Sequence, residues 1–198
     1  MKDLRYLVLT LYSRFFPLLY ILENALKTGI FSIIEKELGK EWFLVQLNDN
    51  SSDPLFKAEI TQIINRKPSN YVITPELLKE ESGFGIWVEF FNPRIYKLSK
   101  GRPIKVFTGL PREVKRVDIY KRLITVKEFR NQLVHSRFPL IKSAGDLIRL
   151  DETEEIYAIL LQLIHWLGES PLMTLDQFKQ EAGEIRMLLL KTSTTNII

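Results

Sequence analysis

Apolar residues recur at gaps of three and four along most of this chain, and this helical period constrains the fold more than any other feature. The clearest stripe consists of Ile156, Ile159, Leu160, Leu163, Ile164 and Leu167. No segment shows the apolar–polar alternation that is typical of a half-buried strand. The chain has 198 residues, of which 45% are hydrophobic, so it is large enough to bury a full core. The sequence therefore predicts an all-α helical bundle in a single domain, residues 1–198.

Prolines, glycines and capping residues divide this pattern into segments. We expect a first helix over residues 2–16, ended by Pro17, and a second over residues 18–38, capped by Gly39. Further helices are expected at about residues 54–65, 111–136, 156–167 and 174–191. Another should begin at Thr74 and extend to Phe91, unless Gly83 and Gly85, which weaken its middle, instead mark a tight packing point. Residues 92–111 are rich in proline and glycine and are expected to form an irregular basic loop, with room for a short helix. The tail from about residue 192 is expected to fray.

The basic residues are concentrated in the segment 94–142. This segment has 14 Lys and Arg against 3 Asp and Glu, so it carries +11, whereas the rest of the chain carries −7 and the whole chain +4. Phosphates favour binding to clustered cations, which indicates an anionic partner such as nucleic acid. The alternative is an ordinary solvated surface.

Several kinds of protein are disfavoured by what the sequence lacks. The chain has no cysteine, which excludes disulfides and thiolate chemistry and suits a reducing cytoplasm. Arg14, Pro17 and Glu23 interrupt the N-terminal apolar run, so we expect no signal peptide and no stretch that spans a bilayer. The sequence has no Gly-rich phosphate loop, no His-Glu-x-x-His site and no Gly-x-Ser-x-Gly elbow. We expect a cytoplasmic protein with no metal site, no cofactor and no membrane partner.

The stretch 127–139 contains one of the two histidines, His135, at the expected end of a helix. Asn131 and His135 should lie one turn apart, and the long side chain of Arg130 can converge with them on one small anion. The guanidinium fork suits phosphate oxygens, and imidazole titrates near neutral pH. These groups could cleave RNA without a metal, one moving a proton and the other stabilising charge on the phosphate. Alternatively, they cap carbonyls or pair with an acid such as Glu128.

This stretch resembles the R-N-x-x-x-H motif of HEPN-domain proteins, in particular the Abi-like (abortive infection) branch. The resembling blocks are Leu22–Lys27 with Leu38–Phe43, Ser82–Asn92 and Tyr120–Pro139. Together they cover most of residues 21–140. The resemblance implies a HEPN-type helical bundle that acts as a dimeric ribonuclease, in which the motifs of two copies form one composite site. By this resemblance Arg130 and His135 carry cleavage, and Asn131 helps to orient them.

The resemblance also suggests partners and a biological role. Proteins of this family act in phage defence and as toxins of toxin–antitoxin pairs, so we expect RNA and a second copy as partners and an antitoxin as a further candidate. Some HEPN domains bind RNA or nucleotides without cutting them. A non-catalytic RNA-binding or interaction module is therefore the alternative function.

Several residues outside the motif are candidates for supporting roles. Arg122, Lys127 and Arg137 lie near the motif in sequence and are candidates for RNA phosphate contacts, with solvated charge as the alternative. Glu23 lies in an apolar helix, where a charge needs a partner, and by the resemblance it should support Arg130 or another cation. An exposed helix face is the alternative for Glu23. Core positions are expected for Trp42, Trp87 and Trp166, and a surface position for His165.

Overall fold

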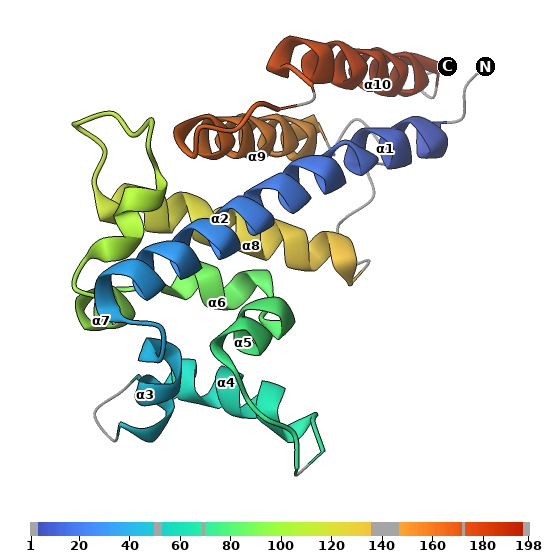
Figure 1. Cartoon of the computed structure of the whole chain (residues 1–198). Helices are drawn as coiled ribbons and strands as arrows, with labels where there is room; N and C mark the ends of the chain where they lie inside the picture. Colours follow the sequence, from blue (N-terminus) through green and yellow to red (C-terminus); the bar gives the residue numbers. More distant parts are fainter. Residues whose placement is uncertain (1–3, 50–52, 69, 136–146, 172, 196–198) are drawn as a thin grey trace. The chain divides into compact units, whose positions relative to one another are not determined.

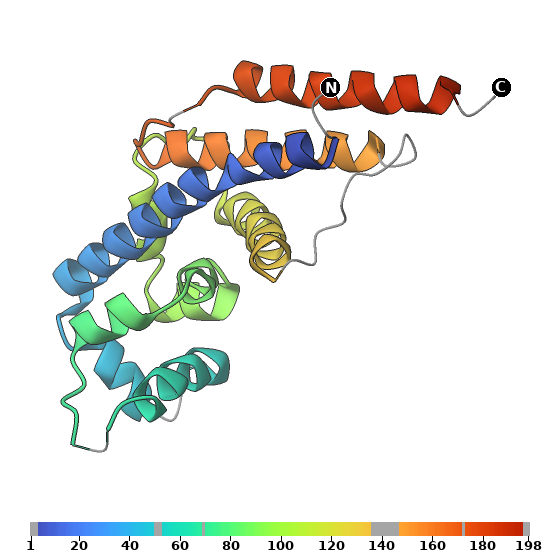
Figure 2. The ribbon, with the colours of Figure 1, turned by 90° about the vertical axis from the view of Figure 1, so that its right-hand side faces the viewer.

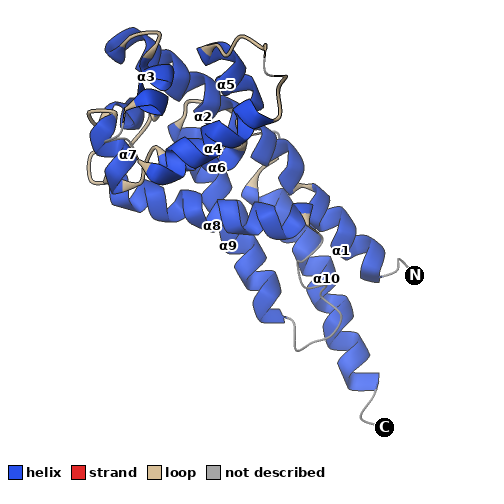
Figure 3. Ribbon diagram, turned by 90° about the horizontal axis from the view of Figure 1, so that it is seen from below, coloured by secondary structure: helices blue, strands red, loops and turns tan. Residues whose placement is uncertain are grey.

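The computed structural model describes residues 4–49, 53–68, 70–135, 147–171 and 173–195, and every regular element in these ranges is helical (Figures 1 and 3). The elements are α1 (Leu4–Ser13), α2 (Phe15–Leu38), α3 (Trp42–Asn48), α4 (Pro54–Asn65), α5 (Pro75–Glu81), α6 (Phe84–Glu89), α7 (Pro93–Leu98), the 3-10 helix η1 (Arg102–Val106), α8 (Arg116–Val134), α9 (Leu147–Trp166) and α10 (Leu175–Thr195). The predicted all-α class is confirmed. The chain divides into two compact units, which are described separately below.

Unit 1 is formed by the two ends of the chain, Met1–Leu22 and Glu128–Ile198. Within it, α1 and α9 both pack against α10, and α9 and α10 run side by side (Figure 2). The predicted capping box opens α10, because the Gln177 N–H donates to Thr174 Oγ1 at 3.3 Å and the Thr174 N–H donates to Gln177 Oε1 at 2.9 Å. These two bonds satisfy donors at the helix N-terminus that would otherwise lack a partner.

The core of unit 1 is built around Phe15. Its ring centroid lies 4.5 Å from that of Phe129, 5.3 Å from that of Tyr157 and 5.4 Å from that of Phe178. Tyr157 and Phe178 stack on each other at 3.8 Å. These four rings come from α2, α8, α9 and α10, so a single aromatic cluster joins the helices that the two ends of the chain contribute.

The first two helices are separated at Arg14, not at Pro17 as predicted. Pro17 is the third residue of α2, where an N–H would have no acceptor within the helix, so proline is tolerated there. Arg14 instead turns its guanidinium to Glu181 on α10, with contacts of 2.8 and 3.1 Å. The end of α2 at Leu38 is as predicted, and Gly39 follows with φ of 103°, the left-handed conformation that glycine adopts at helix ends.

The helical run Leu4–Leu38 is long and apolar enough to cross a membrane by length and composition alone, so the expectation that no such stretch exists is wrong. Of the most apolar 18-residue window of this run, 44% is buried inside the structure. A core helix passes the same test of length and composition. Val8, Leu11 and Phe15 are fully buried in this run, so packing of unit 1 accounts for its inward face.

Unit 2 comprises Glu23–Lys127 and has an aromatic core of its own. Phe90 stacks on Trp87 at 5.8 Å and meets Phe56 edge-on at 5.7 Å, while Trp42 lies 5.9 Å from Phe56. The tryptophans predicted to be core residues are only slightly exposed, with fractions of 8% for Trp42, 1% for Trp87 and 4% for Trp166 of unit 1. That prediction is confirmed.

Two helix predictions in unit 2 need correction. The helix expected over residues 74–91 is two helices, α5 and α6, because Ser82 and Gly83 both have extended ψ angles that end one helix before the next begins. The predicted start of this segment at Thr74 is confirmed, since Thr74 Oγ1 accepts the Leu77 N–H at 3.1 Å at the beginning of α5. The last helix of the unit, α8, begins at Arg116 instead of residue 111, and it is continuous as expected.

The basic segment 92–111 is more ordered than predicted, because it contains α7 and η1. Asn92 caps α7 by accepting the Arg94 N–H at 3.0 Å. Gly101, with φ of 72°, then turns the chain into η1. The Asn92 cap and the Gly101 turn are both local features. In a stretch rich in proline, each is equally compatible with an irregular loop. At the other end of the chain, α10 continues to Thr195, beyond the expected fraying at residue 192.

Candidate functional site

Arg130, Asn131 and His135 lie at the C-terminal end of α8, in unit 1. The helix ends at Val134, and the His135 N–H donates to the Asn131 carbonyl at 3.1 Å. This bond places His135 one helical turn after Asn131, as predicted. Asn131 and His135 are exposed and Arg130 is half-buried. The turn that carries the motif is therefore on the surface of unit 1.

Two buried neighbours fix the orientation of this turn. Phe129 and Leu133 are 6% and 4% exposed. The ring of Phe129 packs 4.5 Å from Phe15 and 6.3 Å from Tyr12. Because residues 129 and 133 are one turn apart on the inward face, residues 131 and 135 are held on a different face, which is exposed.

The guanidinium of Arg130 turns toward Asn131. Its Nη1 donates to Asn131 Oδ1 at 3.4 Å, a long and weak hydrogen bond. Arg130 makes no ion pair with a carboxylate of any described residue, and Glu128 has no partner among them. The imidazole of His135 likewise has no hydrogen-bond partner in the described part of the chain. Pairing of Arg130 with Glu128, one of the structural alternatives, is thus not observed.

The three predicted phosphate-binding residues have different positions. Lys127 and Arg122 belong to unit 2 and are both engaged there, Lys127 with Glu89 at 2.8 Å and Arg122 with the Asp118 carbonyl at 3.3 Å. Arg137 lies outside the described residues. Contacts of these residues with RNA stay a prediction, and Lys127 would have to leave its carboxylate to make one.

Glu23 is half-buried on α2. It makes no hydrogen bond or ion pair with a described residue. Its expected support of a cation therefore stays a prediction. His165, the other histidine, is exposed on α9 as predicted.

A polar cluster around Glu89 in unit 2 was missed by the sequence analysis. Lys127 Nζ lies 2.8 Å from Glu89 Oε1, and the Tyr120 hydroxyl and Asn92 Nδ2 donate to Oε2 at 3.2 and 3.3 Å. Burial is the main cause of the raised pKa of Tyr120, so its hydroxyl keeps the proton that it donates. A glutamate inside the apolar run 86–91 was the available signal, because a charge in such a run requires a partner.

Glu59 on α4 approaches the same cluster across Gly85. A Cβ at Gly85 would lie 3.8 Å from Glu59 Oε1 and 4.0 Å from Lys127 Cδ, so the glycine borders both side chains. Burial is the largest cause of the raised pKa of Glu59, Lys127 opposes it, and the charge of Glu89 reinforces it. Glu59 as a whole residue is nevertheless exposed.

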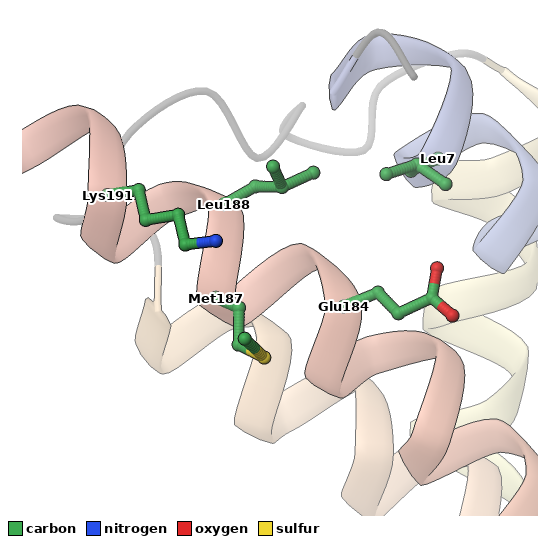
Figure 4. A pocket seen from close by; sticks show the side chains of 5 residues that line it. All are labelled: Leu7, Glu184, Met187, Leu188 and Lys191. Atoms are coloured by element: carbon green, nitrogen blue, oxygen red, sulfur yellow. The ribbon is translucent and has the colours of Figure 1, made fainter. Parts of the chain in front are cut away.

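A metal cluster does not accompany the motif in the described part of the chain. No three His, Asp or Glu side chains there come together in a way that could hold a metal ion. A groove of about 310 Å³ between α1 and α10 is lined by Leu7, Glu184, Met187, Leu188 and Lys191 (Figure 4). None of the predicted site residues lines this groove.

No family model, no curated protein and no solved structure matches this chain. The resemblance to HEPN-domain proteins consequently rests on the sequence blocks alone and stays a prediction.

Proposed function

We propose that this protein is a metal-independent endoribonuclease that uses Arg130 and His135, with a second copy completing the site, as a toxin or phage-defence effector. The observation that supports this best is the exposed turn at the end of α8. It presents a guanidinium, an amide and an imidazole together, and no described carboxylate neutralises the guanidinium.

These groups match the requirements of RNA transesterification. The ribose 2′-oxygen attacks the adjacent phosphorus while the bond from phosphorus to the 5′-oxygen breaks. An imidazole accepts the 2′-hydroxyl proton, and a proton must reach the leaving 5′-oxygen. Arg130 would stabilise the negative charge on the phosphate oxygens through its planar fork. The products are a 2′,3′-cyclic phosphate and a 5′-hydroxyl.

A second copy of the chain would supply what one copy lacks. The motif contains a single histidine, whereas the reaction needs both a base and an acid. Two motifs facing each other would provide two imidazoles and two guanidinium groups. This is why we expect a homodimer to be the active form.

Exposed cations on unit 2 support RNA as the ligand and also favour the alternative, a non-catalytic RNA-binding module. Arg102 and Lys105 both form ion pairs with Glu37. In contrast, six exposed cations have no side-chain partner among the described residues, namely Arg94, Lys97, Lys100, Arg112, Lys115 and Lys121. Such a set favours binding of a phosphate backbone without requiring cleavage.

The decisive experiment incubates the purified protein with RNA in the presence of EDTA. We expect cleavage that persists in chelator, leaves 2′,3′-cyclic phosphate ends and fails on a substrate with 2′-deoxyribose at the cut site. His135→Ala should abolish it. His165→Ala is the matched control, since it removes the other histidine, which is exposed on α9, and should cleave like wild type.

The possible results separate the two functions. Equal cleavage by His135→Ala and wild type would rule out the proposed site. Salt-sensitive RNA binding without any cleavage would support the RNA-binding module, and no affinity for RNA at low salt would exclude both. Growth arrest on expression, relieved by Arg130→Ala, would support the toxin role.

A further inference from the structure

An apolar stripe is exposed on the outer face of α1 and the start of α2, within unit 1. This outer stripe consists of Tyr6, Leu9, Phe16 and Tyr20, which are 62%, 46%, 51% and 71% exposed. The inward face of the same helices holds Val8, Leu11 and Phe15, which are fully buried. At about 100° per residue the outer stripe lies roughly 140° round from them. These four side chains are therefore not part of the core of their own unit.

The spacing of the outer stripe is self-complementary. Exposed Ser13 completes the series, so the positions recur at gaps of three, four, three and four, as in a coiled-coil seam. The series is nearly symmetric about Ser13. In an antiparallel pair, Tyr6 of one copy would lie opposite Tyr20 of the other, and Leu9 opposite Phe16. We propose that the outer stripe is the surface on which a second copy of this chain docks, antiparallel and about a two-fold axis near Ser13.

The charges on this helical run favour a second copy over a charged partner. Between Tyr6 and Leu22 the only charged residue is Arg14, and Glu181 already binds it. The stripe thus offers no cation to a nucleic acid and no acid to a basic peptide. Its aromatic composition is that of the buried centre of protein interfaces.

The exposed area of the stripe would supply most of a standard dimer interface. From their exposed fractions, the four side chains present roughly 500–600 Å², compared with about 800 Å² per partner in a standard interface. Ser13 at the centre is small, so two helices can approach closely there. The outer stripe would then form the apolar middle of the interface.

The test is the mass of the full-length protein in sedimentation equilibrium over a wide range of concentration. Wild type should be a dimer, and Leu9→Lys should weaken its association at least about tenfold, because a lysine would be placed in the apolar centre. Leu190→Lys is the matched control, since Leu190 on α10 is 50% exposed against 46% for Leu9 but lies off the stripe. It should leave the dimer intact. Melting curves should show that both variants are folded.

A charge-pair variant tests the antiparallel register. Leu9→Lys combined with Phe16→Glu in one chain places each lysine opposite a glutamate of the second copy only if the helices are antiparallel. This double variant should recover most of the association lost in Leu9→Lys. A parallel pair would place lysine opposite lysine, so an absence of recovery would contradict the register.

Other outcomes would overturn the proposal. A wild-type protein that stays monomeric at high concentration would do so, as would a dimer that Leu9→Lys leaves unchanged. Flotation with neutral lipid vesicles that Leu9→Lys abolishes, without a dimer in solution, would assign the stripe to a membrane. The proposal does not rest on ribonuclease activity. If His135→Ala cleaves normally while the stripe variants behave as expected, only the proposed function fails.

Discussion

The ammonium group of Lys127 lies 2.8 Å from the carboxylate of Glu89, and both side chains are largely buried, at 25% and 17% exposed. Tyr120 and Asn92 donate to the other oxygen of the same carboxylate. This pair joins α6 to α8 inside unit 2.

Removing the charge of Glu89 should destabilise the protein. We expect Glu89→Gln to lower the free energy of unfolding by about 1–3 kcal/mol, since it leaves the largely buried Lys127 without its counter-charge. Urea unfolding of the single variants and of the Glu89→Gln, Lys127→Met double variant measures the coupling. A double variant whose loss equals the sum of both single losses would show that the pair does not interact.

The raised pKa of Glu59 predicts a specific dependence on pH. A carboxyl group whose pKa is higher in the folded than in the unfolded state binds more protons when folded, so its contribution to stability falls as pH rises from the ordinary glutamate pKa to the folded one. Glu59→Gln should therefore melt at a higher temperature than wild type at pH 7. The difference should vanish below about pH 4, where glutamate is protonated in both states. An unchanged difference across this range would contradict the assignment.

Gly29 is required where α2 meets η1. A Cβ at Gly29 would lie 2.3 Å from Val106 Cγ2. Gly29→Ala should therefore cost about 1–3 kcal/mol of stability despite the better helix propensity of alanine. Gly183→Ala on α10 is the control, because nothing lies within 4 Å of its Cβ, and it should be neutral or stabilising by up to about 1 kcal/mol. Thermal unfolding of both proteins checks the contrast, and Val106→Ala should partly rescue the first.

The hydroxyl of Tyr157 is buried and has no hydrogen-bond partner among the described residues. Its ring stacks on Phe178, which Tyr157→Phe would preserve. Because an unpaired buried hydroxyl costs roughly 1–3 kcal/mol, we expect this variant to be at least as stable as wild type. Differential scanning calorimetry tests this, and a clear loss of stability would indicate a bond that the hydroxyl makes.

At the proposed RNA site, Arg130→Lys separates charge from shape. Lysine keeps the positive charge but cannot form the bidentate fork, so RNA affinity at low salt should change little while cleavage falls by about 10- to 100-fold. Arg94→Lys, which changes an exposed arginine of unit 2 in the same way, should not affect cleavage. Equal rates for all three proteins would mean that Arg130 acts only through its charge.

Local signals made the helical part of this fold predictable. The Thr174–Gln177 box and the Thr74 cap each depend on residues within three positions of each other, so both could be found from the sequence. The contact of Arg14 with Glu181 could not, because the two residues are 167 positions apart. The predicted helix break at Pro17 is absent because proline is tolerated in the first turn of a helix.

In the candidate site, too, local relations could be predicted from the sequence and contacts between distant residues could not. The one-turn relation of Asn131 and His135 follows from helix geometry alone and was predicted. The engagement of Lys127 was not, because Glu89 is distant in sequence and its apolar neighbours concealed that it carries a buried charge. Spacing predicts which side chains share a face, but it cannot show which cations are already neutralised.

The composition of unit 1 from both ends of the chain has a consequence for biosynthesis. Unit 2 is contiguous, so all of its internal contacts become possible once residue 127 has left the ribosome. Helix α1 is synthesised long before α10, against which it packs. Until then the nascent chain carries Val8, Leu11 and Phe15 without their core, an apolar segment suited to chaperone binding during translation.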